Sequence, residues 1–240
     1  MDYSTIRGTI NYVSDEDSDK GRKRGYEYFT LTLHKDGGRV QRALSIIEDQ
    51  PIVVRDILES VSKDWHLQDC YVRIHSKKQF TGTGWFRFHN NLAECETFTT
   101  TEGRVSQYMT LESGPVVFCN HSIVGDAWMM TAYDISQGPG RQKVEQMLTP
   151  TLNKQGAEGP ILTRSALGIE FVGKETIKVP AGIFQCLHFK TGRYDRNHAL
   201  ATASLNYDIW CTADSHYVTI MSMYAGKRRY EMVQWQDSTE

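Results

Sequence analysis

Apolar and polar side chains alternate along most of this chain, in short runs separated by turn-forming residues. One clear run spans residues 26–34, where a single face carries three apolar side chains, Phe29, Leu31 and Leu33. Alternation with a period of two is the pattern of a half-buried β-strand. The run ends at Asp36-Gly37-Gly38, which tolerates positive φ, so we expect residues 26–34 and 40–47 to form a hairpin.

The same pattern recurs on both sides of a less regular middle segment. It predicts strands near 6–13, 52–60, 69–76, 80–89, 92–100 and 103–111, and again near 165–179, 182–192, 203–213, 216–224 and 228–236. Short strands joined by short turns favour an antiparallel meander. Only residues 119–150 lack clean alternation, and we expect a short helical or irregular segment there. The predicted class is all-β and mainly antiparallel, a large meander barrel or half-barrel.

A chain of 240 residues fits one such domain, because large β-barrels often reach this size as single units. We therefore predict a single β-barrel-like domain over residues 1–240, with two sheet halves joined near 140–160 as an alternative arrangement. A barrel of this size has more interior than side chains easily fill, which favours a ligand cavity.

Composition and charge limit which binding partners and which cellular location we expect for this protein. The formal net charge is -2, with 27 basic and 29 acidic residues, so no strong field favours nucleic acid. No secretory leader or apolar run of about 20 residues is visible, which predicts a cytoplasmic protein that does not enter a membrane. The five cysteines form no C-x-x-C pair, which favours reduced and mostly buried thiols.

The C-terminal third carries two short motifs, Val179-Pro180-Ala181-Gly182-Ile183-Phe184 and Tyr207-Asp208-Ile209-Trp210. They resemble the V-P-A-G-x-F and Y-x-x-W pattern of bacterial β-barrel proteins of unknown function, which are similar to lipoprotein-carrier-like and lipocalin-like barrels. The resemblance implies a barrel fold. Proline followed closely by glycine suits a corner between two strands, so we interpret this part of the motif as architectural.

Sequence signatures of common catalytic machinery are absent. The chain has no G-x-G-x-x-G after a strand, no G-x-x-x-x-G-K-[ST], no G-x-S-x-G and no H-E-x-x-H. Its eight histidines lack the spacing that would place two imidazoles on one metal ion. We therefore predict neither a cofactor nor a metal.

The irregular segment 118–128 holds the most chemically suggestive residues. His121 and Asp126 lie a few positions apart, and a histidine of near-neutral pKa oriented by a carboxylate is a typical general base. We predict these two residues as catalytic. The alternative is a histidine satisfied within the fold and an aspartate that caps the helix starting at Ala127.

Further candidates lie on strands and would bind a substrate. Residues 71–75 and 85–89 share the order aromatic, apolar, arginine, apolar, histidine. If their polar faces line a barrel lumen, Trp85 and the two arginines hold an aromatic or carboxylated molecule, and otherwise these faces are solvated. The predicted binding residues are Arg73, Arg87, Trp85, Trp128, Tyr207 and Trp210.

Three functions fit these features. The first is a cofactor-independent lyase, isomerase or dehydratase that acts on a hydrophobic or aromatic small molecule, with His121 moving a proton. The second is a non-catalytic binding or carrier protein for a hydrophobic ligand. The third is an interaction scaffold that uses the charged segment 15–24 and has a filled interior. The sequence leaves the substrate and the oligomeric state open.

Overall fold

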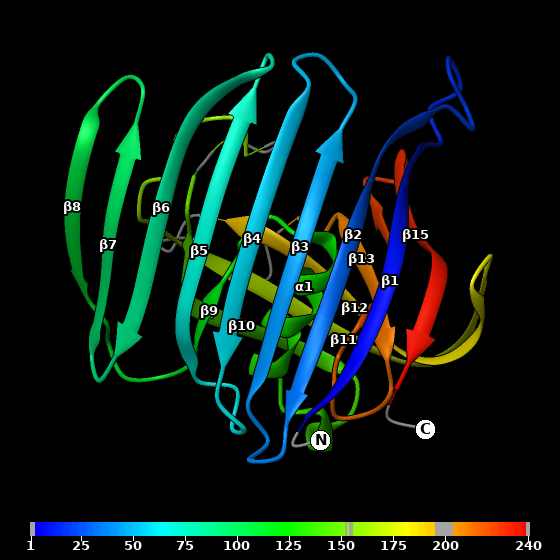
Figure 1. Cartoon of the computed structure of the whole chain (residues 1–240). Helices are drawn as coiled ribbons and strands as arrows, with labels where there is room; N and C mark the ends of the chain where they lie inside the picture. Colours follow the sequence, from blue (N-terminus) through cyan, green and yellow to red (C-terminus); the bar gives the residue numbers. More distant parts are fainter. Residues whose placement is uncertain (1–2, 152, 154–155, 195–203, 239–240) are drawn as a thin grey trace.

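The computed structural model describes residues 3–151, 153, 156–194 and 204–238. These residues form one 15-stranded sheet with the order β8-β7-β6-β5-β4-β3-β2-β1-β15-β14-β13-β12-β11-β10-β9 (Figure 1). Every neighbouring pair is antiparallel except β9 and β10, which are parallel. The all-β, mainly antiparallel prediction is confirmed.

The first half of the chain is an uninterrupted meander of hairpins. Its strands are β1 (Tyr3–Ser14), β2 (Lys23–His34), β3 (Arg39–Ile47), β4 (Val53–Val61), β5 (Leu67–Ser76), β6 (Gln79–His89), β7 (Leu92–Thr99) and β8 (Gly103–Thr110). Each strand that alternation predicts in this half is present. The residues alternate because one face of each strand is buried and the other is solvated. The hairpin predicted at residues 26–47 is β2 paired with β3.

The second half forms the other part of the sheet. Its strands are β9 (Val116–Phe118), β10 (Gly140–Thr149), β11 (Thr163–Val179), β12 (Gly182–Tyr194), β13 (Tyr207–Thr212), β14 (Thr219–Tyr224) and β15 (Arg228–Asp237). The predicted strand near 203–213 is shorter at both ends, and residue 203 lies outside the described part of the chain.

The two halves meet where the first and last strands pair. β1 and β15 run antiparallel, with Ile6 opposite Asp237 and Ser14 opposite Arg228. A backbone hydrogen bond from Ser238 to Thr5 continues this pairing at the chain ends. The middle of the sheet is therefore made from the two ends of the sequence.

Residues 111–139 cross from β8 to β10 and include β9 and three short helices. The helices are α1 (Ile123–Asp126), η1 (Ala127–Ala132) and η2 (Ile135–Gln137). The prediction of a helical or irregular segment is confirmed for this part. The prediction was wrong for residues 140–149, which form β10. The last residues of β10 are buried on both faces of the strand, and such a strand does not show the alternation of polar and apolar residues that sequence reasoning uses.

The crossing segment divides the hydrophobic core into two clusters. On one side, Val124 and Trp128 pack against the inward residues of β1–β7. On the other side, Ala127 and Met130 pack against β10–β13. Figure 1 shows α1 behind β3 and in front of the strands of the second half. The helical segment therefore packs between the two curved halves of the sheet and contributes to the core on both sides.

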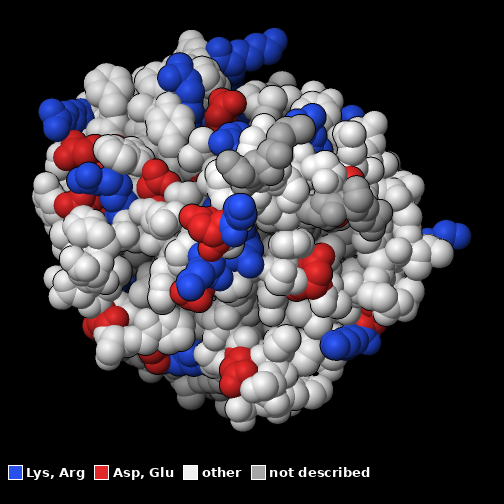
Figure 2. All heavy atoms as spheres, turned by 60° about the horizontal axis from the view of Figure 1, so that its bottom comes forward, with Lys and Arg blue, Asp and Glu red and all other residues white. Residues whose placement is uncertain are grey.

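Two further findings concern the surroundings of the protein. No helix in the described ranges is both long and apolar enough to cross a membrane. All five cysteines are free thiols, and four of them are buried, as predicted. On the face shown in Figure 2, basic and acidic side chains are interspersed.

Candidate functional site: a buried acid at the end of an apolar cavity

Ionisable side chains occupy inward positions on two strands of the first half, β2 and β4. Alternation places Glu27 on the same face of β2 as Phe29 and Leu31, and it places Arg55 and Glu59 among the apolar residues of β4. All three polar side chains are buried, Glu27 and Glu59 with exposed fractions of 0% and 1%. A buried ionisable group is costly unless it has partners, so these positions mark a specialised part of the interior.

Glu27 holds the start of α1. Its carboxylate accepts hydrogen bonds from the backbone amides of Ile123 (3.0 Å) and Val124 (2.8 Å). It also accepts from the hydroxyls of Tyr12 (2.9 Å) and Ser45 (2.6 Å). These donors satisfy both of its oxygens, and the amides are ones that an isolated helix start leaves unpaired. Glu27 is therefore a structural acid.

Glu59 is held differently, since its partners bind only one of its two oxygens. Oε2 accepts from the Gln41 amide (2.5 Å) and from the Asn120 amide (2.6 Å). Asn120 is itself oriented, because its Oδ1 accepts from the backbone amide and the hydroxyl of Ser122. The absence of a Cβ at Gly125 makes room for Gln41, whose Nε2 would lie 2.4 Å from such an atom.

The second oxygen of Glu59, Oε1, has no hydrogen-bond partner within the described ranges. Burial raises the pKa of Glu59 to about 8, although the hydrogen bonds from Gln41 and Asn120 oppose this shift. A carboxyl with such a pKa is mostly protonated at neutral pH. Because Oε2 already accepts two N–H groups, the proton belongs on Oε1.

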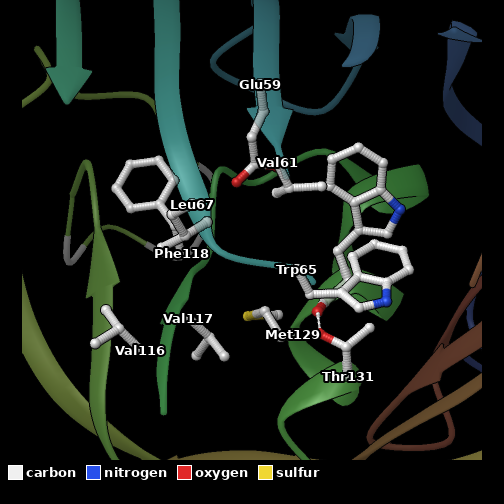
Figure 3. Close-up of a pocket in the computed structure, with 10 residues that line it drawn as sticks. Glu59, Val61, Trp65, Leu67, Val116, Val117, Phe118, Met129 and Thr131 are labelled. Atoms are coloured by element: carbon white, nitrogen blue, oxygen red, sulfur yellow. Dashed lines mark hydrogen bonds between the residues drawn. The ribbon is translucent and has the colours of Figure 1, made fainter. Parts of the chain in front are cut away.

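An apolar cavity adjoins this carboxyl. Its lining comes from β4, the β4–β5 turn, β5, β9 and η1 and consists of Glu59, Val61, Trp65, Leu67, Val116, Val117, Phe118, Trp128, Met129 and Thr131. Figure 3 shows the Glu59 side chain pointing from β4 into the space bordered by these residues. The closed space is about 20 Å³, room for about one water molecule. This is much smaller than the ligand chamber that the chain length favours.

The cavity extends from a buried end to the surface. Glu59 and Val61 are almost fully buried, whereas Trp65, Leu67 and Val116 are partly exposed. An apolar molecule that enters from outside would therefore meet the Glu59 carboxyl at the inner end.

Trp65 and Trp128 form an aromatic corner beside the cavity. Their ring centroids are 5.6 Å apart and the ring planes make an angle of 71°. Tyr217 packs against Trp65 at the same centroid distance. The guanidinium of Arg39 lies 4.1 Å from the centroid of the Trp65 ring. Trp65 lies in the β4–β5 turn with a φ of 64°, a conformation uncommon for a residue with a side chain.

His121 lies in the turn between β9 and α1, with a φ of 66°. Its carbonyl accepts a hydrogen bond from the Arg55 guanidinium, and its Nε2 lies 3.2 Å from the Thr149 hydroxyl. Since that hydroxyl donates to the Thr151 carbonyl, the histidine nitrogen is the donor in this contact. Burial of the ring, aided by the charge of Arg55, lowers the pKa of His121 to about 3. The expectation of a near-neutral pKa was wrong, because an interior ring near a cation stays neutral.

Asp126 is engaged elsewhere. It accepts a hydrogen bond of 2.5 Å from the Tyr207 hydroxyl, which also lies 2.9 Å from the Ser222 hydroxyl. Burial raises the pKa of Asp126 to about 7, against the effect of the Tyr207 hydrogen bond. No hydrogen bond joins His121 to Asp126 in the part of the chain that is described. The cap of α1 is Ser122, and Asp126 makes no side-chain cap bond to η1.

The binding residues predicted on β5 and β6 lie on the outer face of the sheet. Trp85 is 44% exposed, and Arg73 and Arg87 are exposed as well. Arg87 stacks on Trp85 and pairs with Glu94. Of the two alternatives for these faces, the solvated one is therefore observed, and the three side chains do not line the interior. Val72 and Phe86, their neighbours along the chain, are the inward residues, and a strand shows opposite faces at successive positions.

The remaining predicted binding residues are separated from one another. Trp128 lines the cavity and donates to the His216 carbonyl at 3.2 Å. Tyr207 belongs to the Asp126 pair. Trp210 stacks on His188 with a centroid distance of 4.3 Å and donates to Glu175. Only Trp128 of the predicted binding residues therefore contributes to the cavity.

His188 forms a second polar cluster. Its Nδ1 lies 2.8 Å from Glu175 and its Nε2 lies 2.8 Å from Asp208. Both ring nitrogens thus face carboxylates. Burial raises the pKa of Glu175, but hydrogen bonds from Trp210 and His188 outweigh it and lower the pKa overall. Neither this cluster nor any other set of His, Cys, Asp and Glu among the described residues is arranged to hold a metal ion.

Comparison with known proteins identifies a fold. No protein family matches this sequence, and no curated protein matches it. A crystal structure of a β-barrel-like protein, a domain of unknown function DUF1849 from Brucella abortus, is similar with a TM-score of 0.60 and 10% identity, and each chain covers 98% of the other. A DUF1089 family protein from Pseudomonas aeruginosa is more distant, with a TM-score of 0.44, 10% identity and coverage of 83% of this chain and 89% of that one. The protein therefore has a β-barrel-like fold.

Sequence reasoning missed Glu59 and Glu27, although a signal for them was present. Each interrupts the apolar face of a strand whose alternation is otherwise regular. A charged residue at an inward position is rare without a structural or functional reason. Trp65 had no comparable signal, because its position in a turn does not reveal which strands it covers.

Proposed function

We propose that this protein binds a small, mostly apolar molecule in the cavity between the β4–β5 hairpin, β9 and η1. One observation carries the proposal: the Oε1 atom of Glu59, a 1% exposed residue, has no partner among the described residues, and the carboxyl lines the cavity. Ligand sites typically have apolar walls and a few polar groups at defined positions. The ligand would widen the cavity by moving Trp65, which lies in the β4–β5 turn.

The resemblance of the C-terminal motifs supports the same proposal. Val179 ends β11 and Gly182 begins β12, so the V-P-A-G pattern forms the turn between two long strands. Kinship with lipocalin-like and lipoprotein-carrier-like barrels would agree with a role in binding a small hydrophobic molecule. We also propose that the protein works in the cytoplasm, without nucleic acid or a membrane as partner, which cell fractionation would test.

A pair of variants with added tryptophan tests the binding proposal. Leu67→Trp fills the outer part of the cavity, whereas Tyr71→Trp places the same side chain on the exposed face of the same strand. Ligand extracted from the native protein would be identified by mass spectrometry, and its binding followed by fluorescence of the cavity tryptophans. Wild type and Tyr71→Trp should bind and Leu67→Trp should not. Equal binding by all three would place the ligand elsewhere.

A cofactor-independent acid–base enzyme is the second candidate. The buried pair of Asp126 and Tyr207 favours it, because a carboxyl with a pKa near 7 suits proton transfer. His121 and Asp126 do not line the cavity, so this function needs a separate site. Slow conversion of the extracted ligand by wild type, lost in Asp126→Asn and His121→Ala, would establish catalysis. An unchanged ligand would favour binding alone.

A further inference from the structure

The cavity contains an acid that has no counterion among the residues the structure describes. The two groups that hydrogen-bond to Glu59 are neutral amides, Gln41 and Asn120. No basic side chain in the described ranges forms an ion pair or a hydrogen bond with it, and the nearby charge that acts on it, Asp69, is negative. A buried carboxylate is stable only with a compensating positive charge or strong donors. The negative charge of the Glu59 carboxylate is therefore neutralised either by a proton or by a bound cation.

The walls of the cavity also favour a cation. Trp65 already packs against the guanidinium of Arg39, and together with Trp128 it presents two aromatic rings at a large angle. Aromatic faces attract organic cations, because the ring quadrupole is negative above the ring plane. The Sδ atom of a third wall residue, Met129, adds a polarisable group.

The size of the closed space limits the group that reaches Glu59. It accepts about one water molecule, and an –NH3+ head is of similar size. Beyond it, the partly exposed Leu67 and Val116 offer an apolar path toward the surface. A quaternary ammonium would be too large for the inner end, whereas a primary amine on an alkyl chain fits both parts.

We propose that this cavity selects primary alkylammonium compounds, with the –NH3+ head donating to Glu59 Oε1 and the alkyl chain lying against the apolar walls. This inference rests on the proposed binding function and specifies its ligand class. When the protonated acid binds such a cation, the carboxyl proton leaves to solvent and a carboxylate–ammonium pair forms. One proton is thus released for each cation bound.

The proton release gives the binding a defined pH dependence. Below the pKa of Glu59, each unit of pH increase should tighten alkylammonium binding about tenfold. The increase should level off above about pH 8. A neutral alcohol of the same length gains nothing from ionisation of Glu59, so its affinity should not rise over this range.

Calorimetric titration of the full chain with n-hexylammonium chloride and with 1-hexanol at pH 6, 7 and 8 tests the inference. Two buffers of different ionisation enthalpy would report the number of protons released. We expect hexylammonium to bind more tightly than hexanol at pH 8 and to release about one proton at pH 6 to 7. Glu59→Gln replaces a neutral acid with a neutral amide of the same shape and should weaken hexylammonium at least tenfold at pH 8 while retaining hexanol. Glu48→Gln, the same change at an exposed turn, should alter neither.

The outcomes separate this inference from the proposed function. Binding of hexanol without tighter binding of hexylammonium would overturn the choice of a cation and leave the binding function standing. Binding of hexylammonium without proton release, or equally well by Glu59→Gln, would also overturn it. If neither compound binds, both the ligand class and the proposed site are wrong. The wild-type measurements decide between these outcomes even if the Glu59 variant does not fold.

Discussion

At the scale of single residues, the interior of this protein contains acids that serve different purposes. Glu27 has a donor for each of its oxygens and supports the helical segment. Glu59 is held through one oxygen and offers the other to a cavity. Asp126 is paired with Tyr207. Net charge or composition does not distinguish these roles, because they depend on which donors face each carboxyl.

The raised pKa of Glu59 predicts how stability changes with pH. The ordinary pKa of 4.5 applies to the unfolded chain and the value of about 8 to the native protein, so the native state binds more protons between these values. The free energy of unfolding should therefore fall as pH rises from about 5 to about 8, by a few kcal/mol. Asp126 contributes in the same direction up to about pH 7.

Urea unfolding of wild type and Glu59→Gln at pH 5, 6.5 and 8 would measure this effect. The variant should show a clearly smaller loss of stability between pH 6.5 and 8, because glutamine does not titrate. His121 acts with the opposite sign but only between about pH 3 and 6.5, so it does not obscure the comparison above that range. Parallel curves for the two proteins would contradict the assignment.

A variant of Trp210 distinguishes the binding role predicted from the sequence from the stabilising role indicated by its contacts in the structure. Its indole stacks on His188 and donates to Glu175, and it does not line the cavity. Trp210→Phe keeps the stacking and removes the hydrogen bond, so we expect a loss of about 1 kcal/mol in unfolding free energy. Ligand binding in the cavity should be unchanged. A loss of binding with intact stability would favour the original prediction of a binding residue.

At the scale of elements, α1 depends on the strands that it packs against. It has only four residues, too few to be stable alone, and two buried acids from β2 and β4 reach its start. Glu27 binds its first amides directly, and Glu59 binds Asn120, which orients the Ser122 cap. The conformation of the crossing segment therefore depends on side chains distant in sequence.

Glu27→Ala should destabilise the protein strongly. It leaves two helix amides and the hydroxyls of Tyr12 and Ser45 without their acceptor, which predicts a loss of about 3–5 kcal/mol. Chemical denaturation would measure this loss, and hydrogen exchange at Ile123 and Val124 would show whether α1 opens first. Glu48→Ala, at an exposed turn, should stay within about 0.5 kcal/mol of wild type. A similarly small effect at Glu27 would exclude its role as a helix anchor.

At the scale of the whole molecule, the pairing of β1 with β15 makes one sheet from two meanders. Met232 and Ile10 lie opposite each other and are both fully buried. Without this pairing, β1 and β15 would each present an unpaired edge in the middle of the sheet. Both termini are therefore part of the central structure rather than appendages.

Removal of the last strand should thus abolish folding. A chain ending at Lys227 lacks β15, and we expect it to lose the cooperative unfolding transition and the near-ultraviolet circular dichroism of the intact protein. As a control, shortening the charged segment at residues 16–21 removes mainly exposed groups, such as Asp17 and Lys20, and should leave the fold intact. A folded truncated chain would show that the sheet forms without β15.

Alternation in the sequence determined most of the fold, because a strand with one buried face repeats every two residues and its turns carry recognisable residues. It also placed Val72 and Phe86 on the apolar faces of β5 and β6, and the structure shows that these faces point inward. The tertiary structure alone decided that the chain ends pair, that residues 140–149 form β10, and that Glu59 meets Trp65 and Trp128 at one cavity. These features arise from contacts between segments far apart in sequence, which local patterns do not encode. The same reason accounts for His121 and Asp126, close in sequence but bound to different partners.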